Sequence, residues 1–165
     1  MKWGPSLLEE TEDEDWGFYG EAIQAWKAWR VIELHGILLL QSLVHRANWI
    51  PRQEMVSECM NKSNPNFRPH LSPNIRHGCG IYSVKQQDWA LQWQRYPNIE
   101  DVVVYGRVSI WGNVFKFTKG YISEYAYPSY LYVPPDKGQE LYETIHPEEL
   151  RVELNNTYVV EVEVT

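Results

Sequence analysis

The sequence contains no apolar run of the length that a membrane span requires. Such a span needs about 18 consecutive apolar residues, whereas the best candidate, ILLLQSLV at residues 37–44, has only the length of a β-strand. The N-terminal MKWGPSLLEE lacks a basic segment followed by an apolar one, so we expect no secretion signal, no membrane partner and a cytoplasmic protein. The two cysteines are then more typical of free thiols or metal ligands than of a disulfide.

Basic charge is also scarce, and the chain carries a net charge of −7. Six of its acids lie close together: Glu9, Glu10, Glu12, Asp13, Glu14 and Asp15. Of the 22 acidic residues the other 16 face 15 basic ones, so the rest of the chain is nearly neutral. We expect an acidic arm over residues 1–20, which is either solvated, or a first helical turn, or attractive to a basic partner. No basic groove is indicated, so direct binding of nucleic acid is not expected.

Length and composition favour one folded domain over residues 21–165. The chain has 165 residues, 44% of them hydrophobic, and eight tryptophans, which is enough to build a core. Residues 30–34 (RVIEL) and 37–44 predict two strands joined by a tight turn at His35 and Gly36, while residues 21–29 contain helix formers. A long Pro-rich loop follows over residues 51–80, and such loops tend to be functional or held by a ligand.

The second half predicts one helix, a meander and a closing strand. A helix is expected over residues 84–96 with Ser83 as its N-cap. Turns at Gly112-Asn113 and Lys119-Gly120 predict a three-stranded meander over residues 102–127. Residues 146–150 indicate a helical turn, and the alternating TYVVEVEVT that ends the chain indicates a half-buried strand. The predicted fold is α+β, with a mixed or antiparallel sheet and few helices, either as one sheet or split into two halves.

Glu124 is the most unusual polar residue of the predicted meander. It shares a strand face with Ile122 and Ala126, where a carboxylate is costly unless it is paired or used. A salt bridge to Arg107 or Lys116 would explain it structurally. Alternatively, Glu124 lines a cleft and takes part in catalysis.

The middle of the chain resembles the ADP-ribosyltransferase superfamily. The resemblance lies in the Gly-Ile-Tyr-Ser turn at residues 80–83, the Trp-Ala-Leu-Gln-Trp helix at residues 89–93 and the Val-rich strand after it. It implies a split sheet and an enzyme that consumes NAD.

The same resemblance implies roles for individual residues. His45 or Arg46 would hold the ribose or phosphates of NAD, and Ser83 would share the second position with Tyr82. Tyr82 would stack on nicotinamide, and Glu124 would stabilise the oxocarbenium-like centre as nicotinamide leaves.

A second resemblance is to an uncharacterised group of small bacterial proteins. The matching runs here are CGIYS at residues 79–83, GRVSIWG at residues 106–112 and ISEYAYP at residues 122–128. The last differs at Ile122, where that group tends to have Arg. This resemblance implies a bacterial or phage origin and brings no function with it.

The Pro-rich loop contains or adjoins four candidate metal ligands: Cys59, His70, His77 and Cys79. Two thiolates and two imidazoles suit a tetrahedral structural zinc that would fasten a loop too polar to pack by itself. Two alternatives stay open. In the first, Cys59 and Cys79 would be buried thiols and His70 would be exposed. In the second, Cys79 would be a nucleophile that His77 activates.

The segment EYAYPSYLYVPP predicts an aromatic surface made by Tyr125, Tyr127, Tyr130 and Tyr132. Tyrosines in such a run either pack on the sheet or anchor a protein interface. We expect a small soluble binding or regulatory protein that acts on another protein through this surface. The alternative is an ADP-ribosyltransferase-like enzyme.

Overall fold

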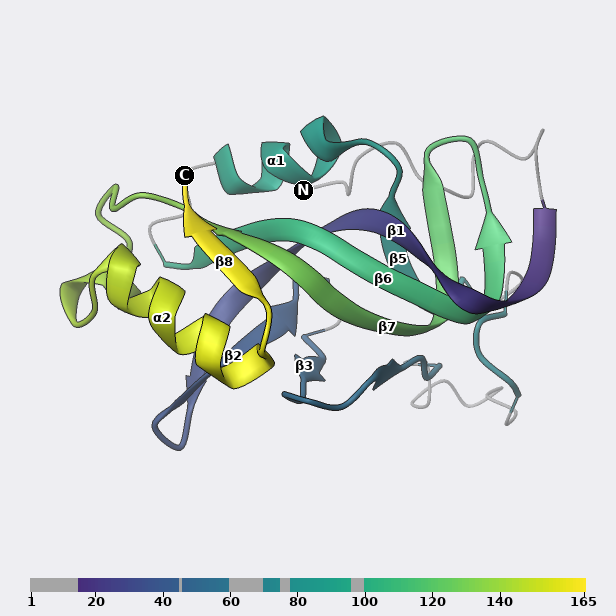
Figure 1. Ribbon diagram of the computed structural model, residues 1–165, viewed down its shortest axis with the longest axis horizontal. Coiled ribbons are helices and arrows are strands. Elements are labelled where there is room, and N and C mark those ends of the chain that lie inside the picture. The colour runs from purple at the N-terminus through teal and green to yellow at the C-terminus, as the bar shows by residue number, and fades with distance from the viewer. Residues whose placement is uncertain (1–14, 45, 60–69, 75–77, 96–99) are drawn as a thin grey trace.

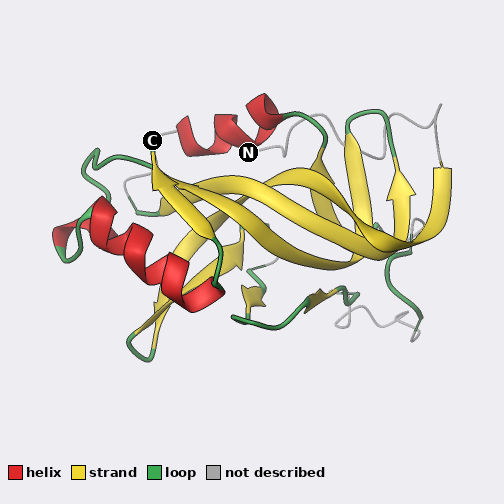
Figure 2. Ribbon diagram, viewed as in Figure 1, coloured by secondary structure: helices red, strands yellow, loops and turns green. Residues whose placement is uncertain are grey.

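A computed structural model of the chain describes residues 15–44, 46–59, 70–74, 78–95 and 100–165. In these residues eight strands form one sheet, accompanied by two α-helices and a short 3-10 helix (Figures 1 and 2). This confirms the predicted α+β fold with few helices. All eight strands share one hydrogen-bonded network, so the sheet is not divided into two separate halves.

Three long antiparallel strands form the body of the sheet. They are β1 (Asp15–Leu34), β6 (Val102–Lys116) and β7 (Gly120–Val133), with β6 in the middle. Figure 1 shows their ribbons crossing the molecule side by side with a pronounced twist. The turn between β6 and β7 is closed by the amide of Phe117, which donates to the carbonyl of Gly120 at 2.9 Å.

Shorter strands extend the sheet beyond β1. After a turn at His35 and Gly36, with φ of 51° and 78°, β2 (Ile37–Ser42) pairs antiparallel with the end of β1. This confirms the predicted hairpin. β3 (Asn48–Trp49) then pairs with β2.

The far edge of β7 is covered by three separate segments. β5 (Ile81–Val84) and β4 (Met55–Val56) pair antiparallel with it, and β8 (Glu161–Val164) pairs parallel, which makes the sheet mixed.

The two helices cover opposite faces of the sheet (Figure 2). α2 (Pro147–Tyr158), which follows the 3-10 helix η2 (Glu140–Glu143), buries Leu150, Leu154 and Tyr158 in the main core beside Trp29. α1 (Gln87–Arg95) packs Ala90 against Ala28, the neighbour of Trp29 in β1. Adjacent strand residues point to opposite faces, so the two helices lie on different sides. None of the helices in the described part of the chain is long and apolar enough to cross a membrane.

Three sequence-based predictions of local structure were wrong, and in one segment the local helix propensity was overridden. Residues 21–29 lie inside β1, because the pairing of residues 23–29 with β6 and the burial of Ala28 and Trp29 on opposite faces outweigh their helix propensity. Ser83 is not an N-cap: it lies in β5 opposite Tyr121, and α1 begins at Gln87. Gly112 and Asn113 form no hairpin, since β6 continues through them. The predicted meander therefore has two long strands rather than three short ones.

The ends of the chain also differ in detail from the prediction. The helical turn expected over residues 146–150 is a longer helix that runs from Pro147 to Tyr158, so the closing strand begins only at Glu161. Residues 15–20 of the expected acidic arm form the start of β1, and the rest of the arm lies outside the described residues.

Candidate metal centre and aromatic surface

Cys59, His70 and Cys79 come together beside the edge of β7. One ligand atom from each, two sulfurs and a ring nitrogen, lies within 4.8 Å of the others. Both cysteines are buried free thiols, and His70 is half-buried. The group could hold a metal ion. The fourth predicted ligand, His77, lies outside the described residues. The predicted activation of Cys79 by His77 therefore also falls outside them.

Pairing with β7 brings the two cysteines together. The amide of Ser57 donates to the carbonyl of Glu124 at 2.8 Å, which continues the β4 pairing to within two residues of Cys59. Cys79 precedes β5 and exchanges two backbone hydrogen bonds with Asn74. Gly80 follows with φ of 135°, and a Cβ there would lie 2.3 Å from Ile122, so only glycine allows this close approach.

Two polar side chains contact the sulfur of Cys79. His70 Nε2 lies 3.4 Å from it, and the hydroxyl of Ser72 donates to it at 3.4 Å. Ser57 in turn donates to Ser72 at 2.8 Å. A tetrahedral zinc with typical bond lengths holds a sulfur and a nitrogen ligand about 3.5 Å apart. The His70 to Cys79 distance therefore fits both a shared metal and a simple hydrogen bond.

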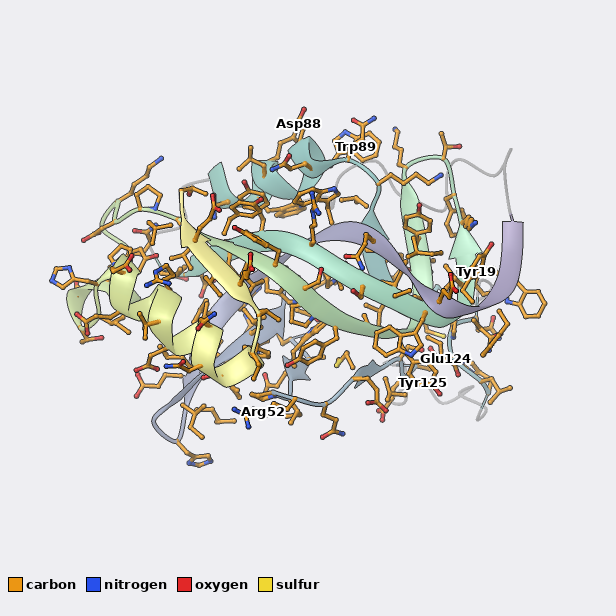
Figure 3. The ribbon with its side chains drawn as sticks, viewed as in Figure 1. Tyr19, Arg52, Asp88, Trp89, Glu124 and Tyr125 are labelled. Carbon is orange, nitrogen blue, oxygen red and sulfur yellow. The ribbon has the colours of Figure 1, made fainter. Side chains whose placement is uncertain are left out.

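Glu124 has a structural partner at a β-bulge. Its Oε1 accepts hydrogen bonds from the backbone amide and the side-chain amide of Asn113, both at 3.1 Å. Gly112 and Asn113 lie opposite Glu124 where the register of β6 and β7 shifts, and Gly112 has φ of 79°. A bulge takes an amide out of the strand ladder, and the carboxylate supplies its acceptor. The partner is thus Asn113 and not the expected Arg107 or Lys116. Figure 3 shows Glu124 beside Tyr125, far from α2.

The other residues implied by the resemblance to ADP-ribosyltransferases are spread over the sheet. Tyr82 lies in β5 opposite Ile122, on the strand next to Glu124, and its hydroxyl donates to the carbonyl of Gly78. Burial and the nearby Cys79 raise the pKa of Tyr82. Ser83 is buried, and its hydroxyl has no hydrogen-bond partner among the described residues.

Arg46, one of the two residues predicted to hold the ribose or phosphates of NAD, lies on the other side of β1 from Tyr82. Arg46 is exposed and follows β2, which is separated from β5 by β1 in the strand order. His45 lies outside the described residues. The internal hydrogen bonds of Tyr82 and Glu124 account for their positions without a bound nucleotide.

Lys27 is a buried titratable residue that the sequence reasoning missed. Its ammonium donates to the carbonyl of Tyr82 at 2.7 Å and lies 5.8 Å from the centre of the Trp49 ring. Burial lowers its pKa to about 8. The signal was available, because Lys27 shares a strand face with Ala25 and Trp29, which are both core residues.

The four tyrosines of the predicted surface lie in three different places. Tyr125 stacks on Trp111, with ring centres 5.9 Å apart. Tyr127 is held internally, since its hydroxyl donates to the carbonyl of Tyr158 and accepts from the amide of Arg52. The remaining two, Tyr130 and Tyr132, are neighbours whose ring centres are 5.0 Å apart.

Tyr130 and Tyr132 belong to a larger group that we call the aromatic column: Trp26, Tyr105, Tyr130 and Tyr132. The rings of Tyr105 and Tyr132 stack at 4.7 Å, and Trp26 lies 6.4 Å from each of them. Tyr105 is buried under α1, whereas the other three are half-exposed. A hydrogen bond to Glu163 raises the pKa of Tyr130 to about 12. The column thus has one covered end and one accessible end.

The bulge contact predicts a stability cost for Glu124→Ala. The variant leaves the Asn113 amide without its acceptor, so we expect the free energy of unfolding to fall by about 1–3 kcal/mol in urea titrations. Glu124→Gln keeps a carbonyl oxygen at this position and serves as the control, with a smaller loss. Equal stability of Glu124→Ala and wild type would contradict the structural role.

From the lowered pKa of Lys27 we expect the free energy of unfolding to increase with pH in the alkaline range. The folded pKa of about 8 lies below the unfolded value of 10.5, so between these pH values the unfolded chain binds the proton that the folded chain has lost. Unfolding then takes up a proton, and wild type should gain about 1–2 kcal/mol from pH 8 to 9.5 relative to Lys27→Met. Below about pH 7, where both the folded and the unfolded chain keep the proton, the difference should be constant. Parallel profiles throughout would contradict the lowered pKa.

Comparison of the chain with protein-family models, with curated proteins and with solved structures gives no significant match. The two resemblances seen in its motifs therefore remain expectations. The arrangement of its own side chains is the basis on which a function can be proposed.

Proposed function

We propose that this chain is a small binding protein that contains a structural zinc ion and recognises a protein partner through the aromatic column. The observation that carries the zinc proposal is the convergence of two thiols and an imidazole from three separate positions in the sequence. Zinc is the common structural metal for such mixed sulfur and nitrogen donors. His77 is the fourth candidate ligand in the sequence.

The proposed role of the zinc is to hold a polar segment on the sheet. β4 contributes only two residues and β5 only four, and the chain between them has few apolar residues to bury. A metal bound by Cys59 and Cys79 would join the ends of this segment next to β7. Its binding free energy would then add to the stability of the folded state.

The binding role rests on the accessible end of the aromatic column. Trp26 and Tyr130 come from β1 and β7, so the column is built on the rigid body of the sheet rather than on a loop. Aromatic side chains presented in this way give contact area at low cost in conformational entropy and are frequent anchors of protein interfaces. Tyr125 and Tyr127 lie elsewhere and are not included in the proposed surface.

Metal analysis tests the zinc proposal. Protein purified without chelator should contain about one zinc per chain by plasma mass spectrometry, and Cys59→Ser, His70→Gln and Cys79→Ser should each lose most of it. Removal of the metal should lower the free energy of unfolding by more than about 2 kcal/mol. His146→Gln, an exposed histidine before α2, is the control and should retain the metal. Absence of zinc together with no uptake of added zinc would refute the proposal.

Substitution of Tyr130 tests the binding surface. A bait carrying Tyr130→Ala should retain less than about a tenth of the protein that the wild-type bait captures from a cell extract. The reason is that replacing an interface anchor by alanine typically costs about 2 kcal/mol or more of binding free energy. Tyr125→Ala removes a similar half-exposed ring away from the column and should leave capture unchanged. Unfolding curves of both variants show whether each is folded. Unchanged capture by a folded Tyr130→Ala variant would rule out the column as the interface.

A further inference from the structure

Arg107 lies at the accessible end of the aromatic column and has no polar partner among the residues that the structure describes. It is exposed, and its guanidinium carbon lies 5.3 Å from the centre of the Trp26 ring. Among the described residues no hydrogen bond or ion pair reaches the guanidinium. This distance is within the range of a cation–π interaction, which leaves the five N–H donors of the guanidinium available to a ligand. Arg107 is therefore a cation held near Trp26 whose donors are unused by the described residues.

The strand register surrounds Arg107 with binding groups. In β6 it lies opposite Trp26 of β1 and opposite Tyr130 of β7, so a half-exposed aromatic ring flanks it on each neighbouring strand. Adjacent strands are about 4.8 Å apart, and side chains of paired residues share a face. A ligand group bound at Arg107 would have an apolar contact on both sides.

A polar trio continues this face two residues along the strands. Gln24 donates to the hydroxyl of Ser109 at 2.7 Å and accepts from the hydroxyl of Ser129 at 2.9 Å. Ser109 lies directly opposite Gln24 and two residues from Arg107. The second amide hydrogen of Gln24 and the hydroxyl hydrogen of Ser109 are left as donors. Together with Arg107 they form a surface with more donors than acceptors, which suits a carboxylate.

Two carboxylates on β8 limit the kind of anion that fits. Glu161 lies opposite Tyr130, and Glu163 accepts the hydrogen bond of the Tyr130 hydroxyl. β8 is two strands away from β6, roughly 10 Å at the usual strand spacing. A single carboxylate at Arg107 avoids them, whereas a continuous polyanion such as a nucleic-acid backbone would run into their negative charge.

We propose that Arg107 binds an aspartate or glutamate side chain of an extended peptide segment in the protein partner, with the flanking apolar residues of that segment on Trp26 and Tyr130. The proposal rests on the proposed function of the aromatic column and specifies the chemistry of its partner. In an extended peptide, side chains two residues apart are about 6.6 Å apart on one face. The partner motif is then an acidic residue with apolar residues two positions before and after it.

Defined peptides test this proposal without knowledge of the natural partner. The probe is a capped, otherwise polar peptide with central glutamate and leucine two positions to each side, and the matched peptides carry glutamine or lysine in the centre. Titration is followed in amide and indole NMR spectra of the full-length protein. Shifts of the Trp26 indole and of the Ser109 amide should saturate with the glutamate peptide, at least about tenfold more tightly than with glutamine.

Variants assign the effect to Arg107. Arg107→Gln should abolish the preference for glutamate, while Arg52→Gln, which removes another exposed arginine from the turn between β3 and β4, should retain it. Equal binding of the glutamate and glutamine peptides at the column would overturn the role of Arg107 and leave the column as an interface. No shift at the column with any peptide at about 1 mM would overturn the Arg107 proposal, and capture by Tyr130→Ala tests the column independently. Tighter binding of the lysine peptide, or of a short single-stranded oligonucleotide, would also overturn it.

Discussion

Hydrogen bonding along both edges of β7 is the constraint on which the other parts of this structure depend. β6 pairs with one edge over nearly the whole strand. The other edge is shared in turn by β5, β4 and β8, which come from widely separated parts of the sequence. β5 and β4 position Cys79 and Cys59, and β8 joins α2 to the sheet. Loss of β7 pairing would therefore remove both the candidate metal centre and the support of the aromatic column.

Two irregularities in the pairing of β6 and β7 determine where Glu124 and Ser129 place their side chains. At Gly112 and Asn113 an extra residue in β6 engages the carboxylate of Glu124. The second shift, between Arg107 and Val108, adds Ser129 to β7 and lets its hydroxyl reach Gln24. Bulges commonly redirect side chains in this way. One of them accounts structurally for the residue that most resembled a catalytic group, and the other helps to build the surface around Arg107.

The sequence predicts the features that depend on local patterns and fails where a distant strand decides the outcome. The turn at His35 and Gly36 and the strand RVIEL are confirmed, because turn chemistry and β-branched residues act locally. The helix formers of residues 21–29 become a strand because β6 supplies a partner some 80 residues later. The cluster of Cys59, His70 and Cys79 was predictable from ligand type. The places of Trp26 and Lys27 depend on which face of β1 each occupies, and they can be predicted only once residues 21–29 are assigned to a strand.

X-ray absorption at the zinc edge distinguishes the proposed zinc site at Cys59, His70 and Cys79 from a cluster held by hydrogen bonds alone. Zinc bound by these residues should have sulfur ligands at about 2.3 Å and nitrogen at about 2.0 Å, with the sulfur signal reduced in Cys79→Ser and unchanged in His146→Gln. A coordination sphere made only of oxygen and nitrogen would contradict the proposed zinc site. It would mean that zinc binds elsewhere on the surface and that the two thiols and His70 are joined by hydrogen bonds alone.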